Sequence, residues 1–182
     1  MRWLCNEPQH TEKYLLVFCD IMDFGRCIIP MADVTIPPDE SKNYLSIARS
    51  HLISATTLLA ENLGLRGCSQ SALLAAEFSL KAVLKSLGKS ESDLRRIGHD
   101  LERAVDEIVS SGAAINESEM RRVINVLPQY VSDRYSENNL TKTQCGDILV
   151  ACQFIAGEAA RFLTNSSFEE QMNSQDVAPG NQ

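Results

Sequence analysis

The fold of this 182-residue chain is decided by the stretch Ser71-Ala72-Leu73-Leu74-Ala75-Ala76-Glu77-Phe78-Ser79-Leu80-Lys81-Ala82-Val83-Leu84-Lys85. Its large apolar residues recur at steps of three and four, which is the spacing of one face of an α-helix. The alanines between them allow a neighbouring helix to approach closely. Glu77 precedes Lys81 by four residues, the favourable order for an ion pair on a helix. The stretch therefore predicts a buried helix over residues 70–87, which Gly88 ends.

Helical spacing continues on both sides of this stretch. Apolar residues at three- and four-residue steps predict further helices over residues 40–62, 99–111 and 142–164. Asp100 and Glu102 place negative charge in the first turn of the second of these, where the helix dipole favours it. Asn116 to Glu119 and Thr141 to Gln144 resemble capping boxes, so a further helix is expected to begin at residue 117.

The order of these elements predicts the fold class. No strand alternates with the helices and most connections are short, so successive helices are expected to pack as antiparallel neighbours. The sequence predicts an all-α protein, an antiparallel up-and-down helical bundle of about five helices. Pro128 is expected to kink or stop the fourth helix.

The two ends of the chain differ from residues 39–164, which hold the predicted bundle. Residues 14–19 are β-prone, and Gly25 and Pro30 interrupt the segment after them. Residues 1–38 are therefore expected to form a short N-terminal extension, either irregular or a β-hairpin. Residues 165–182 are rich in polar residues and glycine, and a disordered tail is expected there.

Composition limits the function. The formal net charge is −7, which argues against binding of duplex nucleic acid by phosphate neutralisation alone. The six cysteines form no CxxC motif, and Cys145 and Cys152 share one helix face. Buried thiols and a reducing compartment are therefore expected. With no apolar membrane span and no signal peptide, the expected location is cytoplasmic. Three histidines without a paired His-Asp-Glu cluster predict neither a metal nor a cofactor.

Three motifs resemble the HEPN family, the nucleotide-binding domains of higher eukaryotes and prokaryotes. The first is the helix quoted above. The second, Gly98-His99-Asp100-Leu101, is similar to the His-Asp-Leu that opens the family's third helix. The third, Tyr130-Val131-Ser132-Asp133-Arg134-Tyr135, resembles the family's Tyr-x-x-Arg-Tyr-Pro segment, with Ser136 in place of the proline. The resemblance covers about residues 40–164.

The resemblance has implications for partners and activity. HEPN domains are helical bundles that commonly form homodimers. Some are ribonucleases of toxin–antitoxin and defence systems, and others bind nucleotides or pair with a small nucleotidyltransferase. HEPN ribonucleases typically place a histidine after an arginine with four to six residues between them, because RNA cleavage needs a group that titrates near neutral pH and a permanent positive charge on the phosphate.

This chain lacks that ribonuclease motif. The best-placed arginine is Arg134, and the positions for its histidine hold Asn139, Leu140 and Thr141. No histidine follows His99. The resemblance therefore favours a non-catalytic bundle that binds a protein partner or a nucleotide. A bound nucleotide is expected to meet Arg134, Tyr135 and Lys81.

Other interpretations stay open. A divergent metal-independent ribonuclease would use Arg134 on the phosphate, with His99 or Asn139 in place of the missing histidine. A purely structural bundle is a third hypothesis. In structural terms, Arg134 could pair with Glu77, His99 could cap its helix and fix the loop before it, and His51 could be a packing residue. The arginine pairs 95–96 and 121–122 are interpreted as solvated helix faces.

Overall fold

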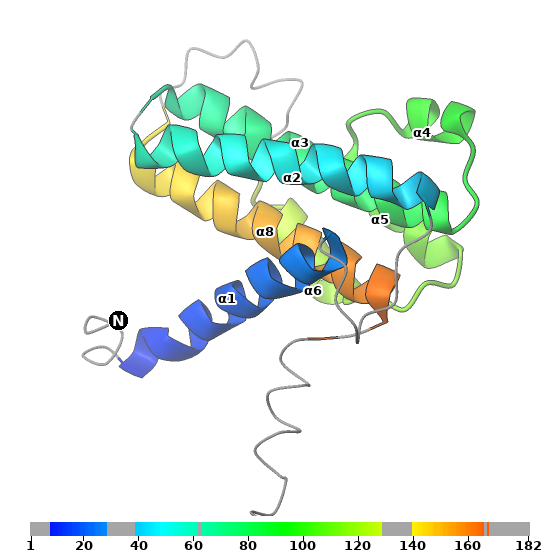
Figure 1. Ribbon diagram of the computed structural model, residues 1–182, viewed down its shortest axis with the longest axis horizontal. Helices are drawn as coiled ribbons and strands as arrows, with labels where there is room; N and C mark the ends of the chain where they lie inside the picture. The colour runs from blue at the N-terminus through cyan, green and yellow to red at the C-terminus, as the bar shows by residue number, and fades with distance from the viewer. Residues whose placement is uncertain (1–7, 29–38, 62, 129–139, 166, 168–182) are drawn as a thin grey trace, which may run out of the picture.

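The structure, a computed structural model, describes residues 8–28, 39–61, 63–128, 140–165 and 167 (Figure 1). Within these ranges all regular structure is helical, which confirms the predicted all-α class. None of the described helices is long and apolar enough to cross a membrane. In chain order the helices are α1 (Pro8–Ile28), α2 (Asp39–Ala60), α3 (Leu65–Ser86), α4 (Glu91–Ile97), α5 (Leu101–Ser110), α6 (Glu117–Ile124) and α8 (Lys142–Thr164).

Helix α3 is the centre of the bundle. Helices α2 and α8 lie along it, and α5 packs against it as well (Figure 1). The alanines of the quoted stretch are buried in these contacts, as the sequence predicted: Ala72, Ala75, Ala76 and Ala82 are each 0% exposed. Their small side chains let three helices approach the same α3 backbone.

Contacts near the helix ends give the direction in which each helix runs. The thiol of Cys145 in α8 donates to the Leu65 carbonyl of α3 (3.3 Å), so these two helices begin at the same end of the bundle. His99 before α5 contacts Glu77 in the middle of α3, and Lys89 after α3 pairs with Glu107 near the end of α5 (2.7 Å). Helices α3, α5 and α8 therefore run in the same direction. Helix α4 leads the chain from the end of α3 back to the start of α5.

Helix α4 was not predicted. The sequence suggested a polar connection over residues 89–98, but Glu91–Ile97 are helical. Ser90 begins this helix with a capping box in which the partner is Asp93. Leu94 and Ile97 are buried, and the Tyr44 hydroxyl of α2 donates to Glu91 (2.9 Å). The capping box was missed because aspartate stands where glutamate is usual and because the helix has only seven residues.

The predicted helix ends are largely correct. Thr141 and Gln144 form the expected capping box at the start of α8. Asn116 caps α6 by accepting from the Glu119 backbone N–H, but the Glu119 side chain pairs with an arginine and does not complete the box. The fourth predicted helix, α6, ends at Ile124, before Pro128. All but the start of the tail expected over residues 165–182 lies outside the described residues.

The expected N-terminal hairpin is wrong for the residues that form α1. Helix α1 crosses α8 and projects from the bundle (Figure 1). Local β propensity is overridden because one helical face of α1 is buried, mainly against α8. The buried residues on this face are Cys19, Asp20, Asp23 and Phe24. Residues 1–7 and 29–38 of the expected extension lie outside the described part of the chain.

Arg161 of α8 holds three carboxylates, two of them from α1. Its Nη1 lies 2.9 Å from Asp20 Oδ1 and 2.9 Å from Asp23 Oδ2, and its Nη2 lies 2.6 Å from Glu158 Oε1. Gly157 permits this approach, since a Cβ there would lie 2.9 Å from the Asp20 Cα. Burial is the main cause that raises the pKa of Asp20 to about 6, against the lowering effect of Arg161.

The Asp20 carboxyl makes stability depend on pH. Its folded-state pKa lies above the ordinary value of 3.8, so the folded chain binds this proton more tightly than the unfolded chain does. Its contribution to the unfolding free energy is therefore most favourable below about pH 4 and is lost as the pH rises through 6, with a difference of about 3 kcal/mol. We expect Asp20→Asn to stabilise the protein at pH 7.5 and to have less effect at pH 5, in urea unfolding at both values.

A matched control for Asp20→Asn is Asp147→Asn, which changes a carboxylate on α8 that is not buried. The control should leave the unfolding free energy nearly unchanged at both pH values. If Asp20→Asn were instead less stable than the parent at pH 7.5, the attraction of Arg161 would exceed the cost of burying the charge.

Candidate functional site

Glu77 anchors the candidate site. It lies in the middle of the central helix α3, and its side chain is only 7% exposed. The Lys81 ammonium, one turn later, donates to Oε1 at 2.6 Å. His99, in the turn between α4 and α5, lies with Nδ1 2.7 Å from Oε2. Each oxygen of this buried carboxylate therefore has a partner.

The pairing with Glu77 orients the His99 ring and holds the Lys81 ammonium. An ionised carboxylate only accepts hydrogen bonds, so His99 donates its Nδ1–H to Glu77. The Lys81 side chain is only 13% exposed, and its ammonium also lies 5.7 Å from the centre of the Phe78 ring. The His99 side chain is 50% exposed.

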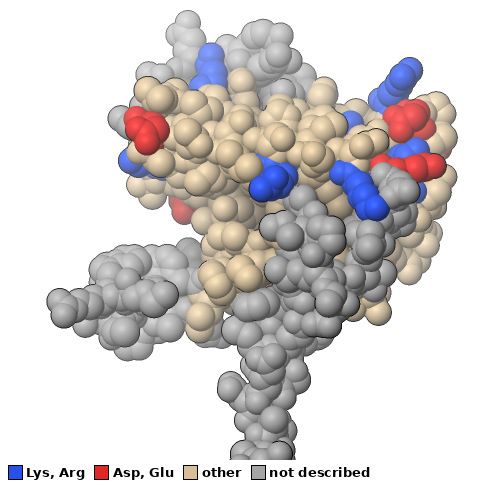
Figure 2. Space-filling view, in the orientation of Figure 1, with Lys and Arg blue, Asp and Glu red and all other residues tan. Residues whose placement is uncertain are grey.

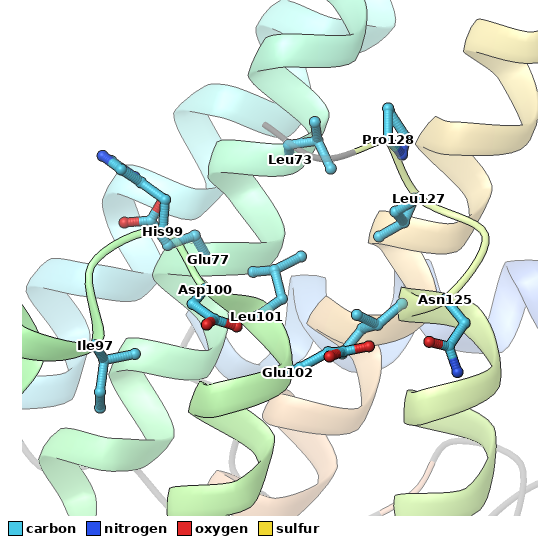
Figure 3. Close-up of a pocket in the computed structure, with 11 residues that line it drawn as sticks. Leu73, Glu77, Ile97, His99, Asp100, Leu101, Glu102, Asn125, Leu127 and Pro128 are labelled. Carbon is cyan, nitrogen blue, oxygen red and sulfur yellow. The ribbon is translucent and has the colours of Figure 1, made fainter. Parts of the chain in front are cut away.

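A cavity of about 490 Å³ opens beside this pair (Figure 3). Leu73, Leu101 and Leu127 turn toward the same space from α3, α5 and the segment after α6. The other residues that line the cavity are Glu77, Ile97, His99, Asp100, Glu102, Ile124, Asn125 and Pro128. The volume lies within the range of small-ligand sites, so the cavity is the leading candidate for a binding site.

The charged residues that line the cavity are acidic. Asp100 and Glu102 are exposed, and neither forms an ion pair with another described residue. The Asp100 side chain caps α5 by accepting from the Arg103 backbone N–H at 3.0 Å. No lysine or arginine is among the described residues that line the cavity. The dipole of α5, which attracts anions to its first turn, is already matched by these two carboxylates.

The structure brings together two of the residues predicted for the site. Lys81 and His99 meet at Glu77. His99 holds the turn before α5 against α3, as one interpretation of the sequence expected, but the residue that caps α5 is Asp100 and not His99. Arg134, Tyr135 and Asn139 lie outside the described residues, and so do Tyr130 and the suggested pair between Arg134 and Glu77. For these groups the sequence-based predictions stay predictions.

His51 is a packing residue, as predicted. Its ring is partly buried and stacks on Phe78, with centroids 5.8 Å apart and planes inclined by 4°.

The arginine pairs 95–96 and 121–122 are largely neutralised by carboxylates. Arg96 pairs with Asp93. The three pairs of the 121–122 group are Arg121 with Asp106, Arg121 with Glu117, and Arg122 with Glu119. In the view of Figure 2, lysines and arginines stand scattered and do not form one patch.

Sequence reasoning missed the cavity. Of the lining residues, it placed Glu102 correctly in the first turn of a helix, whereas Asp100, expected in the same turn, is the residue that caps the helix. No local pattern shows that the end of α6 returns to face α3 and α5. Within the described part of the chain, no group of three or more histidine, cysteine, aspartate or glutamate side chains is arranged to hold a metal ion.

Comparisons of the chain with protein-family models, curated proteins and solved structures find no match. The resemblance to the HEPN family therefore stays a prediction that rests on the motifs of the sequence.

Glu77→Gln tests the energetic role of the anchor. The amide keeps the size of the side chain but loses the charge that Lys81 and His99 share, which leaves a largely buried ammonium without its counterion. We expect a loss of about 2 kcal/mol in the unfolding free energy, measured by urea denaturation at pH 7.5. Glu119→Gln, which removes a surface ion pair, should cost far less. Equal losses in the two variants would show that Glu77 contributes no more than a surface charge.

Proposed function

We propose that this chain is a non-catalytic, HEPN-like helical bundle that binds a partner in the cavity between α3, α5 and α6, and that a protein partner suits this cavity better than a nucleotide. The observation that carries the proposal is the composition of the cavity, with apolar walls and acidic charges beside a buried Glu77. Apolar walls with a few placed polar groups are typical of binding sites.

The ion pair of Lys81 with Glu77 supports a protein partner over a nucleotide. The Lys81 ammonium is bound to Glu77 and shielded by Phe78, so a phosphate would have to compete with a buried carboxylate for it. A nucleotide in the cavity would also bring phosphate charge toward Asp100 and Glu102. Like charges at short range oppose binding. The absence of a histidine after Arg134 supports a non-catalytic role.

The remaining parts of the proposal rest on the resemblance alone. They are the homodimer, the small nucleotidyltransferase as a partner, the toxin–antitoxin or defence context, and a nucleotide contact through Arg134 and Tyr135.

A fragment screen by NMR tests the cavity as the binding site, because it requires no particular ligand to be chosen. We expect fragment hits, and any binding of ATP, GTP or short oligoribonucleotides, to shift the backbone amides of residues 97–102 and 124–127. Asn125→Trp should abolish these shifts by filling the mouth of the cavity, because Asn125 lines it and is exposed. Val126→Trp is the matched control, since Val126 is 76% exposed and does not line this cavity.

A second groove can also bind fragments, so the position of the hits decides between the two sites. A groove of about 310 Å³ lies between α1, α2 and α8, with Ile21, Phe24 and Ile53 among its lining residues. Hits that gather in this groove and leave the amides of the cavity unmoved would contradict the proposal.

One observation favours a second candidate function, a divergent metal-independent ribonuclease. His99 donates to a buried carboxylate, which orients the ring as a carboxylate orients the histidine of a general base. In this function His99 would take a proton from the RNA 2′-hydroxyl and Arg134 would bind the phosphate.

Cleavage of a mixed structured RNA in EDTA distinguishes the two candidates. The proposed binding function predicts no cleavage by the folded protein. The ribonuclease predicts cleavage that falls by about a hundredfold or more in His99→Ala and in Arg134→Ala. His51→Ala is the matched control, because His51 is the histidine stacked on Phe78 and does not line the cavity. Cleavage that survives in His99→Ala would remove the ribonuclease interpretation based on this pair.

A further inference from the structure

The charge of the cavity defines the chemistry of its occupant. The Glu77 carboxylate is matched by Lys81, whereas Asp100 and Glu102 form no ion pair with a described residue. The carboxylates among the described residues that line the cavity therefore have no basic lining residue of lysine or arginine type to balance them. In this partly enclosed, apolar environment the two carboxylates attract a cation more strongly than they would on an open surface.

The walls of the cavity require an apolar part in the same occupant. Leu73, Leu101 and Leu127 face the cavity, with Asp100 and Glu102 along one edge (Figure 3). An aliphatic stem that ends in a positive charge matches both features, because the stem covers the leucines while its head remains at the carboxylates. A guanidinium fits this chemistry, since its planar fork pairs with a carboxylate through two parallel hydrogen bonds.

We propose that the cavity receives the basic side chain, arginine above all, of a partner polypeptide. This inference rests on the proposed function and names the chemistry of its partner. The cavity, at about 490 Å³, is larger than one side chain and has space for the flanking backbone. Asn125, exposed at the mouth, offers an amide that can donate to and accept from a peptide bond.

The test is an NMR titration of the full chain with N-acetyl-arginine amide, with N-acetyl-citrulline amide as the matched neutral probe. Citrulline has nearly the shape of arginine but no charge. We expect the arginine probe to shift the amides of residues 97–102 and 124–127 and to bind about tenfold more tightly than the citrulline probe. The advantage should shrink as salt is raised, because the cavity is open to solvent.

Two variants remove the charges without removing the fold. Asp100→Asn keeps the cap of α5, because asparagine caps as well as aspartate does. Glu102→Gln changes an exposed side chain. Each should weaken the arginine probe about threefold, and the two together about tenfold, the range of one partly screened ion pair each. Glu119→Gln, also in the first turn of a helix but not lining the cavity, should leave binding unchanged.

The outcomes separate this inference from the proposed function. Equal binding of the arginine and citrulline probes would overturn the inference, and so would tighter binding of ATP at the same amides. In both cases the cavity would remain a binding site. If none of the probes, and no fragment, shifted these amides, both proposals would fall.

The source of the cation is tested with two further probes. A capped Ala-Arg-Ala peptide should bind more tightly than agmatine, which carries the same guanidinium on a free aliphatic chain. If agmatine or spermidine bound at least as tightly as the peptide, the polypeptide partner would be overturned and the site would be one for free aliphatic amines.

Discussion

A charge in the middle of the central helix is the constraint on which the bundle depends. Helix α3 is covered by α2, α5 and α8, so a carboxylate at position 77 can be accommodated only with partners on both oxygens. Lys81 comes from the same helix, but His99 comes from the turn between α4 and α5. The need to satisfy Glu77 thus fixes where α5 begins, and the start of α5 forms one wall of the cavity.

The arrangement of α3 to α5 shows what a sequence can predict and what it cannot. Apolar spacing located α2, α3, α5 and α8 because each has a face buried over several turns. Helix α4 has seven residues, too few for a period to be recognised. Its presence adds a reversal of the chain, so α5 runs in the same direction as α3. A prediction without α4 gives α5 the opposite direction, and His99 would then not be placed beside Glu77 as it is.

The N-terminal helix was missed for a different reason. Residues 14–19 favour a strand locally, and the helical spacing of Cys19, Asp20, Asp23 and Phe24 includes two aspartates, which a search for apolar faces does not count. Their role depends on Arg161, which lies 141 residues after Asp20 and 138 after Asp23 in the chain. The candidate site also depends on contacts between elements that no local pattern predicts. Lys81 and His99 were identified from motifs, but the cavity exists because α6 packs close to α5, which no local pattern encodes.

The buried thiols between α3 and α8 make the opening of this interface measurable. Cys68, Cys145 and Cys152 are each 0% exposed, and burial raises the pKa of all three, that of Cys68 to about 11. Alkylating reagents attack the thiolate, so these sulfurs are unreactive while the two helices are in contact. Each covalent modification at these positions therefore records one separation of α3 from α8. Mass spectrometry that assigns the label to individual cysteines would therefore measure how often α3 and α8 separate.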